Sequence, residues 1–135
     1  MKIAIITIVF TTLALIVPSA AAQRSQNQVS VGIRQETAVP AFGIKIKFLD
    51  VIEDSRCPAG RECIWAGNAK VRISVRSGNQ KPLVLEVNST VQPQVVNYGR
   101  YEIRLAGLDP KPAADNVKAG TPKYVATFTI RKLVK

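Results

Sequence analysis

Two cysteines, Cys57 and Cys63, have the spacing in this chain that most directly suggests chemistry. Two thiols can form a disulfide, bind zinc or act as a redox pair. Zinc prefers four ligands, whereas the chain has no histidine and no third cysteine. A thioredoxin-like pair has two residues between its cysteines, and here there are five. We therefore expect a structural disulfide, as in other exported domains, whose small ring contributes about 2.4 kcal/mol.

The other reactive residue types do not form a catalytic pattern. General acid–base and nucleophilic catalysis rely on histidine, an activated cysteine, a carboxylate pair or a metal. The chain has no histidine, and the neighbours Glu53 and Asp54 would point to opposite faces of a strand. No phosphate-binding glycine-rich loop or dinucleotide fingerprint is present. We therefore predict that the protein is not an enzyme and uses no metal or cofactor.

The segment around the cysteines has the composition of a tight structural loop. Pro58 fixes its own φ, and Gly60 and Gly67 can adopt positive φ. We expect the only tryptophan, Trp65, to bury one face of its ring against the disulfide or a sheet edge.

Polar residues before the first cysteine are expected to hold this loop in place. Asp54 or Ser55 can accept backbone N–H groups. Arg56 can pair with Asp54 or Glu53. None of these roles requires a ligand.

The same segment is also the candidate binding loop, with Arg56, Arg61 and Trp65 as its candidate binding residues. A small disulfide ring reduces the entropy that a loop loses on binding, so a rigid loop gains affinity. Arg61 would then be the exposed tip, as a basic residue is in some protease inhibitors. This hypothesis predicts an inhibitor of an envelope protease.

From Asp54 to Ala69 the sequence reads Asp-Ser-Arg-Cys-Pro, four residues, and then Cys-Ile-Trp-Ala-Gly-Asn-Ala. This segment resembles a family of small bacterial exported proteins and lipoproteins that share the pattern D-S-R-C-P-x-x-x-x-C-x-W-x-G-x-A, followed by a strand. The resemblance covers residues 41 to about 75. Many such proteins carry a lipid-attachment cysteine, which this chain lacks. The resemblance supports a β fold and, because the family has no assigned activity, it leaves the function open.

Basic residues dominate the charge, which is +10 for the whole chain. Several occupy the polar positions of predicted strands and form a candidate cationic face: Lys45, Lys47, Lys70, Arg72, Arg76 and Arg104. If these strands are neighbours, one sheet surface could bind an anionic envelope polymer. The face has no aromatic residues for base stacking, which argues against nucleic acid. The alternative is a solvated face whose charge opposes aggregation.

Apolar and polar residues alternate along most of the chain, as they do in half-buried strands. The alternating runs are 29–34, 44–52, 70–76, 83–87, 101–105 and 123–134. Ser77-Gly78-Asn79 predicts a hairpin turn, and no window of eleven residues has a helical period. Residues 54–68 and 109–122 do not look like strands, and such long segments are often functional or disordered.

These runs predict an all-β fold, an antiparallel β-sandwich or a partly open barrel of six to seven strands. An immunoglobulin-like topology is one option, although both cysteines lie in one loop and not on opposite sheets.

The N-terminal residues predict a signal peptide over 1–22 because Lys2 precedes an apolar run that ends in small residues. The alternative, an uncleaved anchor, needs about 20 apolar residues, and this run is shorter. Residues 23–28 then predict a flexible tail, and 29–135 a single β domain.

Together these features predict a periplasmic or secreted bacterial protein that serves as a non-catalytic binding or accessory module of the cell envelope. Its partner would be an envelope protein or an anionic envelope polymer. Protease inhibition through the disulfide loop and polyanion binding through the cationic face are the alternatives.

Overall fold

The computed structural model describes residues 26–113 and 122–134, which form an all-β fold. Its elements are β1 (Gln26–Gly32), β2 (Glu36–Val39), the 3-10 helix η1 (Pro40–Phe42), β3 (Ile44–Asp54), β4 (Ala69–Ser77), β5 (Leu83–Asn88), β6 (Val95–Tyr98), β7 (Tyr101–Asp109) and β8 (Val125–Lys132). Within this part of the chain, no helix is long and apolar enough to cross a membrane. The predicted signal peptide, residues 1–22, lies outside the described residues.

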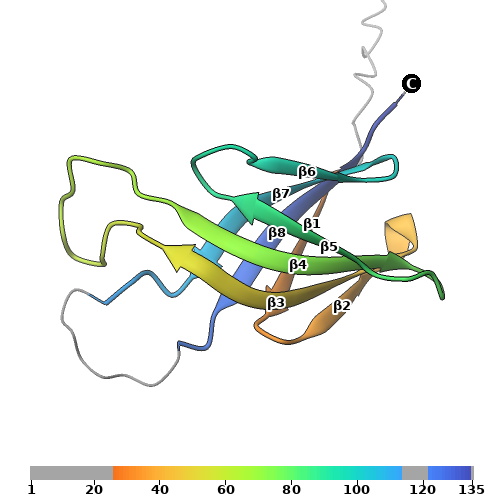
Figure 1. Cartoon of the computed structure of the whole chain (residues 1–135), viewed down its shortest axis with the longest axis horizontal. Helices are drawn as coiled ribbons and strands as arrows, with labels where there is room; N and C mark the ends of the chain where they lie inside the picture. The colour runs from red at the N-terminus through yellow and green to blue at the C-terminus, as the bar shows by residue number, and fades with distance from the viewer. Residues whose placement is uncertain (1–25, 114–121, 135) are drawn as a thin grey trace, which may run out of the picture.

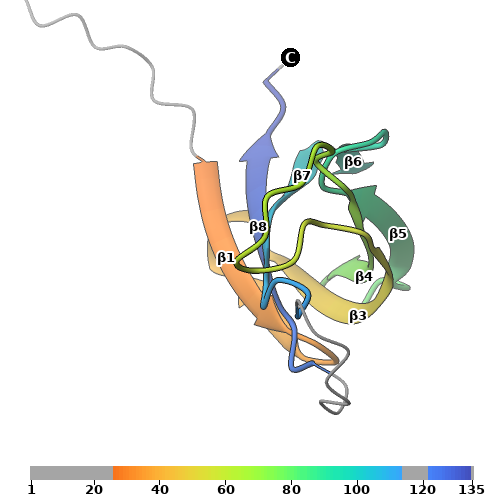
Figure 2. The same cartoon turned by 90° about the vertical axis from the view of Figure 1, so that its left-hand side faces the viewer.

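Two four-stranded antiparallel sheets face each other in an open β-sandwich (Figure 1, Figure 2). The strand orders are β1-β8-β7-β6 and β2-β3-β4-β5, so neighbours in the sequence are neighbours in the sheets, and β1 joins β8. This meander confirms the predicted sandwich. It differs in strand order from an immunoglobulin domain, whose sheets contain strands A-B-E-D and C-F-G.

The core forms where the apolar positions of both sheets meet. On β3, Ile44, Ile46 and Phe48 are buried, whereas the intervening Lys45 and Lys47 are exposed. Phe48 meets Phe128 of the opposite sheet edge to face, with ring centroids 6.5 Å apart. Burying a side chain of this size contributes roughly 1.5–3 kcal/mol, so this interface is the main source of stability.

The turns follow local chemistry. Gly78 has positive φ in the predicted hairpin turn between β4 and β5. In the tight turn between β6 and β7, Tyr98 pairs with Tyr101 across Gly99, which also has positive φ. Glycine reaches this backbone conformation without the steric cost that other residues incur.

The structure differs from the prediction in three elements. β2 and β6 were not expected, and they raise the strand count to eight among the described residues. β1 begins at Gln26, so the prediction of a flexible tail through Gln28 is wrong for residues 26–28, while residues 23–25 lie outside the described residues. Backbone pairing with β8 orders these polar residues, since Gln26 lies opposite Arg131.

The two ends of the sandwich carry different loops. At one end β3 stops and β4 starts, and residues 55–68 connect them as a long loop, here called the motif loop (Figure 1). Figure 2 shows this loop crossing the end of the sandwich that faces the viewer. The opposite end carries η1, the β4–β5 hairpin and the C-terminal end of β8 (Figure 1).

Candidate functional site

The base of the motif loop is an ion pair between the last residue of β3 and the loop. The Arg56 Nε and Nη2 atoms each lie 2.7 Å from a carboxylate oxygen of Asp54. The Arg56 backbone N–H also donates to Asp54 Oδ1, at 3.4 Å. Both predicted roles of Asp54, as a partner of Arg56 and as an acceptor for the loop backbone, are confirmed.

Arg56 also joins the motif loop to the chain that follows β7. Its guanidinium donates to the carbonyl oxygens of Leu108 and Pro110, the second at 2.8 Å. Ala59 adds a backbone hydrogen bond to the carbonyl of Pro112, at 3.1 Å. The Arg56 side chain is only 16% exposed. These donors are used within the fold, and the role of Arg56 as a candidate binding residue stays a prediction.

Electrostatics at this base favour the charged guanidinium and the neutral phenol. The hydrogen bond to Asp54, opposed in part by burial, raises the pKa of Arg56. The Tyr124 hydroxyl donates to Asp54 Oδ2 at 3.2 Å. Burial, together with the charge of Asp54, raises the pKa of Tyr124. The three side chains thus form one hydrogen-bonded polar cluster at the base of the loop.

The other side of the motif loop closes through close backbone approach at Gly67. The Ser55 backbone N–H donates to the carbonyl oxygen of Asn68, at 2.7 Å. The Ser55 hydroxyl donates to the same carbonyl and accepts the backbone N–H of Asn68. Gly67 has φ +66°, and a Cβ at this position would lie 2.0 Å from the Ser55 carbonyl oxygen. Only glycine fits here, for reasons of both conformation and space.

A buried pair of amides connects the motif loop to the turn after β5. The Asn68 side chain donates to Asn88 Oδ1 at 2.9 Å, and its own oxygen accepts the backbone N–H of Thr90 at 3.2 Å. Both asparagines are buried. Because buried polar groups that lack partners destabilise a fold, this pair fixes the position of the loop.

The disulfide ring lies outside this base. Cys57 and Cys63 are bonded, with Cα atoms 5.8 Å apart, which confirms the predicted pairing. Arg61 lies exposed on the ring, where the sequence placed it. The protease-inhibitor hypothesis that rests on Arg61 stays a prediction.

Two apolar residues follow the ring and form what we call the apolar tip, Ile64 and Trp65. Ile64 is 98% exposed and Trp65 is 62% exposed. Trp65 is therefore not enclosed by the fold, and the expectation that one face of its ring is buried against the disulfide or a sheet edge stays a prediction. The base of the loop is held by polar contacts and does not need the tryptophan.

The predicted cationic face is divided between two sheets. Lys45, Lys47, Lys70, Arg72 and Arg76 lie on β3 and β4. Arg104 lies on β7, in the other sheet, because β7 pairs with β6 and β8. The prediction that all six basic residues share one surface is wrong for Arg104.

Carboxylates interleave with the five remaining cations. The ion pairs are Lys70–Glu86 at 2.8 Å, Arg72–Asp50 at 3.6 Å, Arg72–Glu86 at 3.8 Å and Arg76–Glu36 at 2.7 Å. Hydrogen bonds from Arg76 and Lys70 lower the pKa values of the Glu36 and Glu86 carboxyls respectively. Three carboxylates, Glu36, Asp50 and Glu86, thus lie among five cations, and binding of an anionic polymer by this surface stays a prediction.

Sequence reasoning missed four residues that build or expose the loop. Asn68 lies within the loop, Asn88 and Tyr124 reach it from distant positions, and Ile64 shares the tip with Trp65. Ile64 and Asn68 occupy variable positions of the motif, so the motif itself indicates no role for them. Only Ile64, an apolar residue beside a constrained ring, carried a signal that could have identified it.

No protein-family model, no curated protein and no solved structure matches this chain.

Proposed function

We propose that this chain is a non-catalytic binding module of the cell envelope and that the apolar tip is its recognition element. The observation that carries the proposal is the exposure of Ile64 and Trp65 on a loop whose base is fixed. Exposed large apolar side chains are favourable when a partner covers them. A fixed base lowers the entropy lost on binding.

The tip fits a protein partner that offers an apolar cleft. Tryptophan is among the residues that most often dominate the energy of protein interfaces. The charges before the tip, Arg61 and Glu62, have opposite signs. Segments that insert into anionic membranes instead flank their apolar residues with several lysines or arginines. A cleft in an envelope protein therefore suits the tip better than a lipid surface.

A location outside the cytoplasm supports the same proposal. The disulfide is of a kind that persists in oxidising compartments. The predicted signal peptide would direct the chain to such a compartment.

Photo-crosslinking in the organism that encodes the chain tests the proposal. A photoreactive amino acid replaces Trp65 in one variant and Val84 in a control variant. Val84 is 53% exposed and lies near the start of β5, towards the opposite end of the molecule (Figure 1). We expect a discrete protein adduct from position 65 and none from position 84.

Substitution gives the second arm of this experiment. We expect Trp65→Ala to abolish capture of that protein while changing the free energy of unfolding by less than about 0.5 kcal/mol, as for other exposed side chains. Adducts with lipid, equal adducts from both positions, or full capture by Trp65→Ala would each overturn the proposal.

A further inference from the structure

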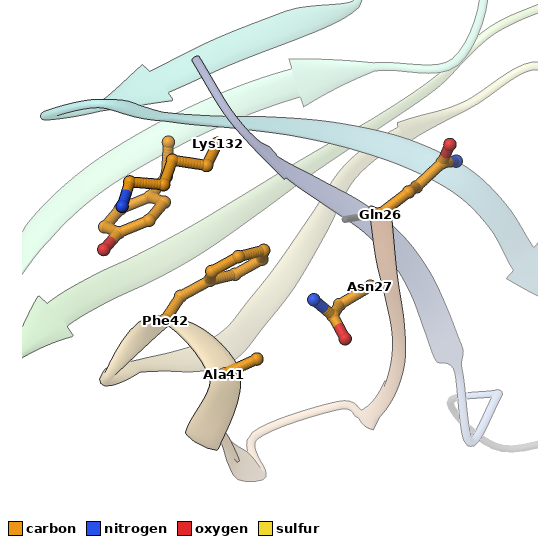
Figure 3. A pocket seen from close by; sticks show the side chains of 6 residues that line it. Gln26, Asn27, Ala41, Phe42 and Lys132 are labelled. Carbon is orange, nitrogen blue, oxygen red and sulfur yellow. The ribbon is translucent and has the colours of Figure 1, made fainter. Parts of the chain in front are cut away.

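A hollow of about 470 Å³ opens at the end of the sandwich opposite the motif loop. It lies between η1 and the strands β1, β7 and β8, and its volume is within the range typical of small-molecule sites. Figure 3 shows this hollow. The lining residues are Gln26, Asn27, Ala41, Phe42, Tyr101 and Lys132.

Two aromatic rings give the hollow an apolar wall. Phe42 and Tyr101 have ring centroids 5.1 Å apart, with planes tilted by 35°. The face of an aromatic ring carries partial negative charge. The aromatic face therefore attracts C–H groups, which are positively polarised. A sugar ring has such C–H groups gathered on one of its two faces.

One amide provides the polar wall. Asn27 comes from the start of β1, and its carboxamide can both donate and accept hydrogen bonds, whereas the Gln26 side chain points away from the hollow (Figure 3). A sugar hydroxyl has the same dual capacity. In Figure 3 the Asn27 amide and the Phe42 ring project into the same space, so one ring could contact both.

The charge of Lys132 favours a sugar that bears a carboxylate. Lys132 lies directly opposite Tyr101 in the β7–β8 register and is exposed. No carboxylate lines the hollow, and Lys132 has no ion-pair partner among the described residues. A carboxylate on the ligand would supply that partner through a charge-assisted hydrogen bond.

A second hollow of about 230 Å³ lies on the outer face of the same sheet, whereas Tyr101 and Lys132 of the first hollow are on the inner face. Gln26 lines both, and the other lining residues of the second are Glu102, Arg104, Thr129 and Arg131. Arg131 pairs with Glu102 at 2.7 Å, and Arg104 donates to the side-chain oxygen of Gln94 at 3.4 Å. The second hollow is therefore a separate surface, and Lys132 is the one cation among the lining residues of the first.

We propose that the first hollow forms a binding site for an anionic sugar, a ring that bears a carboxylate group. The sugar ring stacks against Phe42 and Tyr101 with its carboxylate at Lys132. This site is separate from the apolar tip and does not depend on the proposed function.

Calorimetry and NMR with the purified chain test this site, with trigalacturonate as the probe and neutral maltotriose as its comparison. We expect saturable binding of trigalacturonate, with shift changes at Asn27, Phe42 and Tyr101, and at least tenfold weaker binding of maltotriose. Lys132→Gln should weaken trigalacturonate binding about tenfold, which corresponds to the loss of 1.4 kcal/mol.

Two further variants separate a built site from general charge. Lys111→Gln removes an exposed lysine from the other end of the molecule and should leave the affinity unchanged. Phe42→Leu keeps an apolar side chain and should weaken binding several-fold while the circular dichroism spectrum stays the same. The absence of saturable binding, equal binding of the two sugars, or equal effects of Lys132→Gln and Lys111→Gln would overturn the proposal.

Discussion

Arg56 and Arg76 make the same contact in different surroundings. Each guanidinium uses two nitrogens to face one carboxylate, Asp54 for Arg56 and Glu36 for Arg76. The side chains of the first pair are 16% and 10% exposed, and those of the second 31% and 32%. Water competes more strongly at the second pair, and Arg56 alone also serves two backbone carbonyls.

This difference predicts unequal effects of the same substitution. Arg56→Met leaves Asp54 without its cation and two carbonyls without a donor, so we expect about 3 kcal/mol of destabilisation. Arg76→Met breaks an exposed pair and should cost less than about 1 kcal/mol. Urea unfolding of both variants measures the two values. Equal values would show that Arg56 does not anchor the motif loop.

Sequence distance decided which contacts of Arg56 could be predicted. Asp54 is two residues away, so their pairing follows from local geometry and was expected. The carbonyls of Leu108 and Pro110 come from a segment more than fifty residues later. No local pattern shows which strand end lies beside the loop, so an arginine with all its donors in use could not be distinguished from an exposed one.

The motif loop works as an element because its two sides are held at different places. Asp54 and Arg56 hold one side, while Gly67 and Asn68 hold the other. The disulfide ring lies between these anchors and shapes only the outer part of the loop.

Two glycines of this loop give a matched test of that arrangement. Gly60 and Gly67 both have positive φ, at +75° and +66°, but only at Gly67 would a Cβ meet backbone atoms. Gly60→Ala should cost about 1 kcal/mol from the backbone conformation alone. Gly67→Ala adds a steric clash and should cost about 2 kcal/mol more. Thermal unfolding compares them, and equal costs would contradict the close approach at Ser55.

At the scale of strands, prediction succeeded where alternation was long enough to see. Each of the six predicted runs overlaps a strand. β2 and β6 have four residues each, and only Val39 among them is buried, so they carry almost no period-two signal. Alternation also says which face a residue occupies but not which sheet its strand joins. For this reason Arg104 was placed with the wrong cations.

The whole molecule keeps its two proposed binding regions at opposite ends of one apolar core (Figure 1). The motif loop crosses one end, and the first hollow opens at the other. The paired charges on β3, β4 and β5 lie along one flank between them. A substitution at either end should therefore leave binding at the other unchanged, since distant sites without shared partners behave additively.

The exposure of Trp65 on the folded protein is the claim on which the proposed function depends, and the chain has only this one tryptophan. Its fluorescence, measured with the neutral quencher acrylamide in native buffer and in denaturant, reports that exposure without interference. We predict that the native emission maximum lies close to that of the unfolded chain and that acrylamide quenches both states to a similar extent. A clearly blue-shifted native emission that resists quenching would show a buried ring and contradict the account.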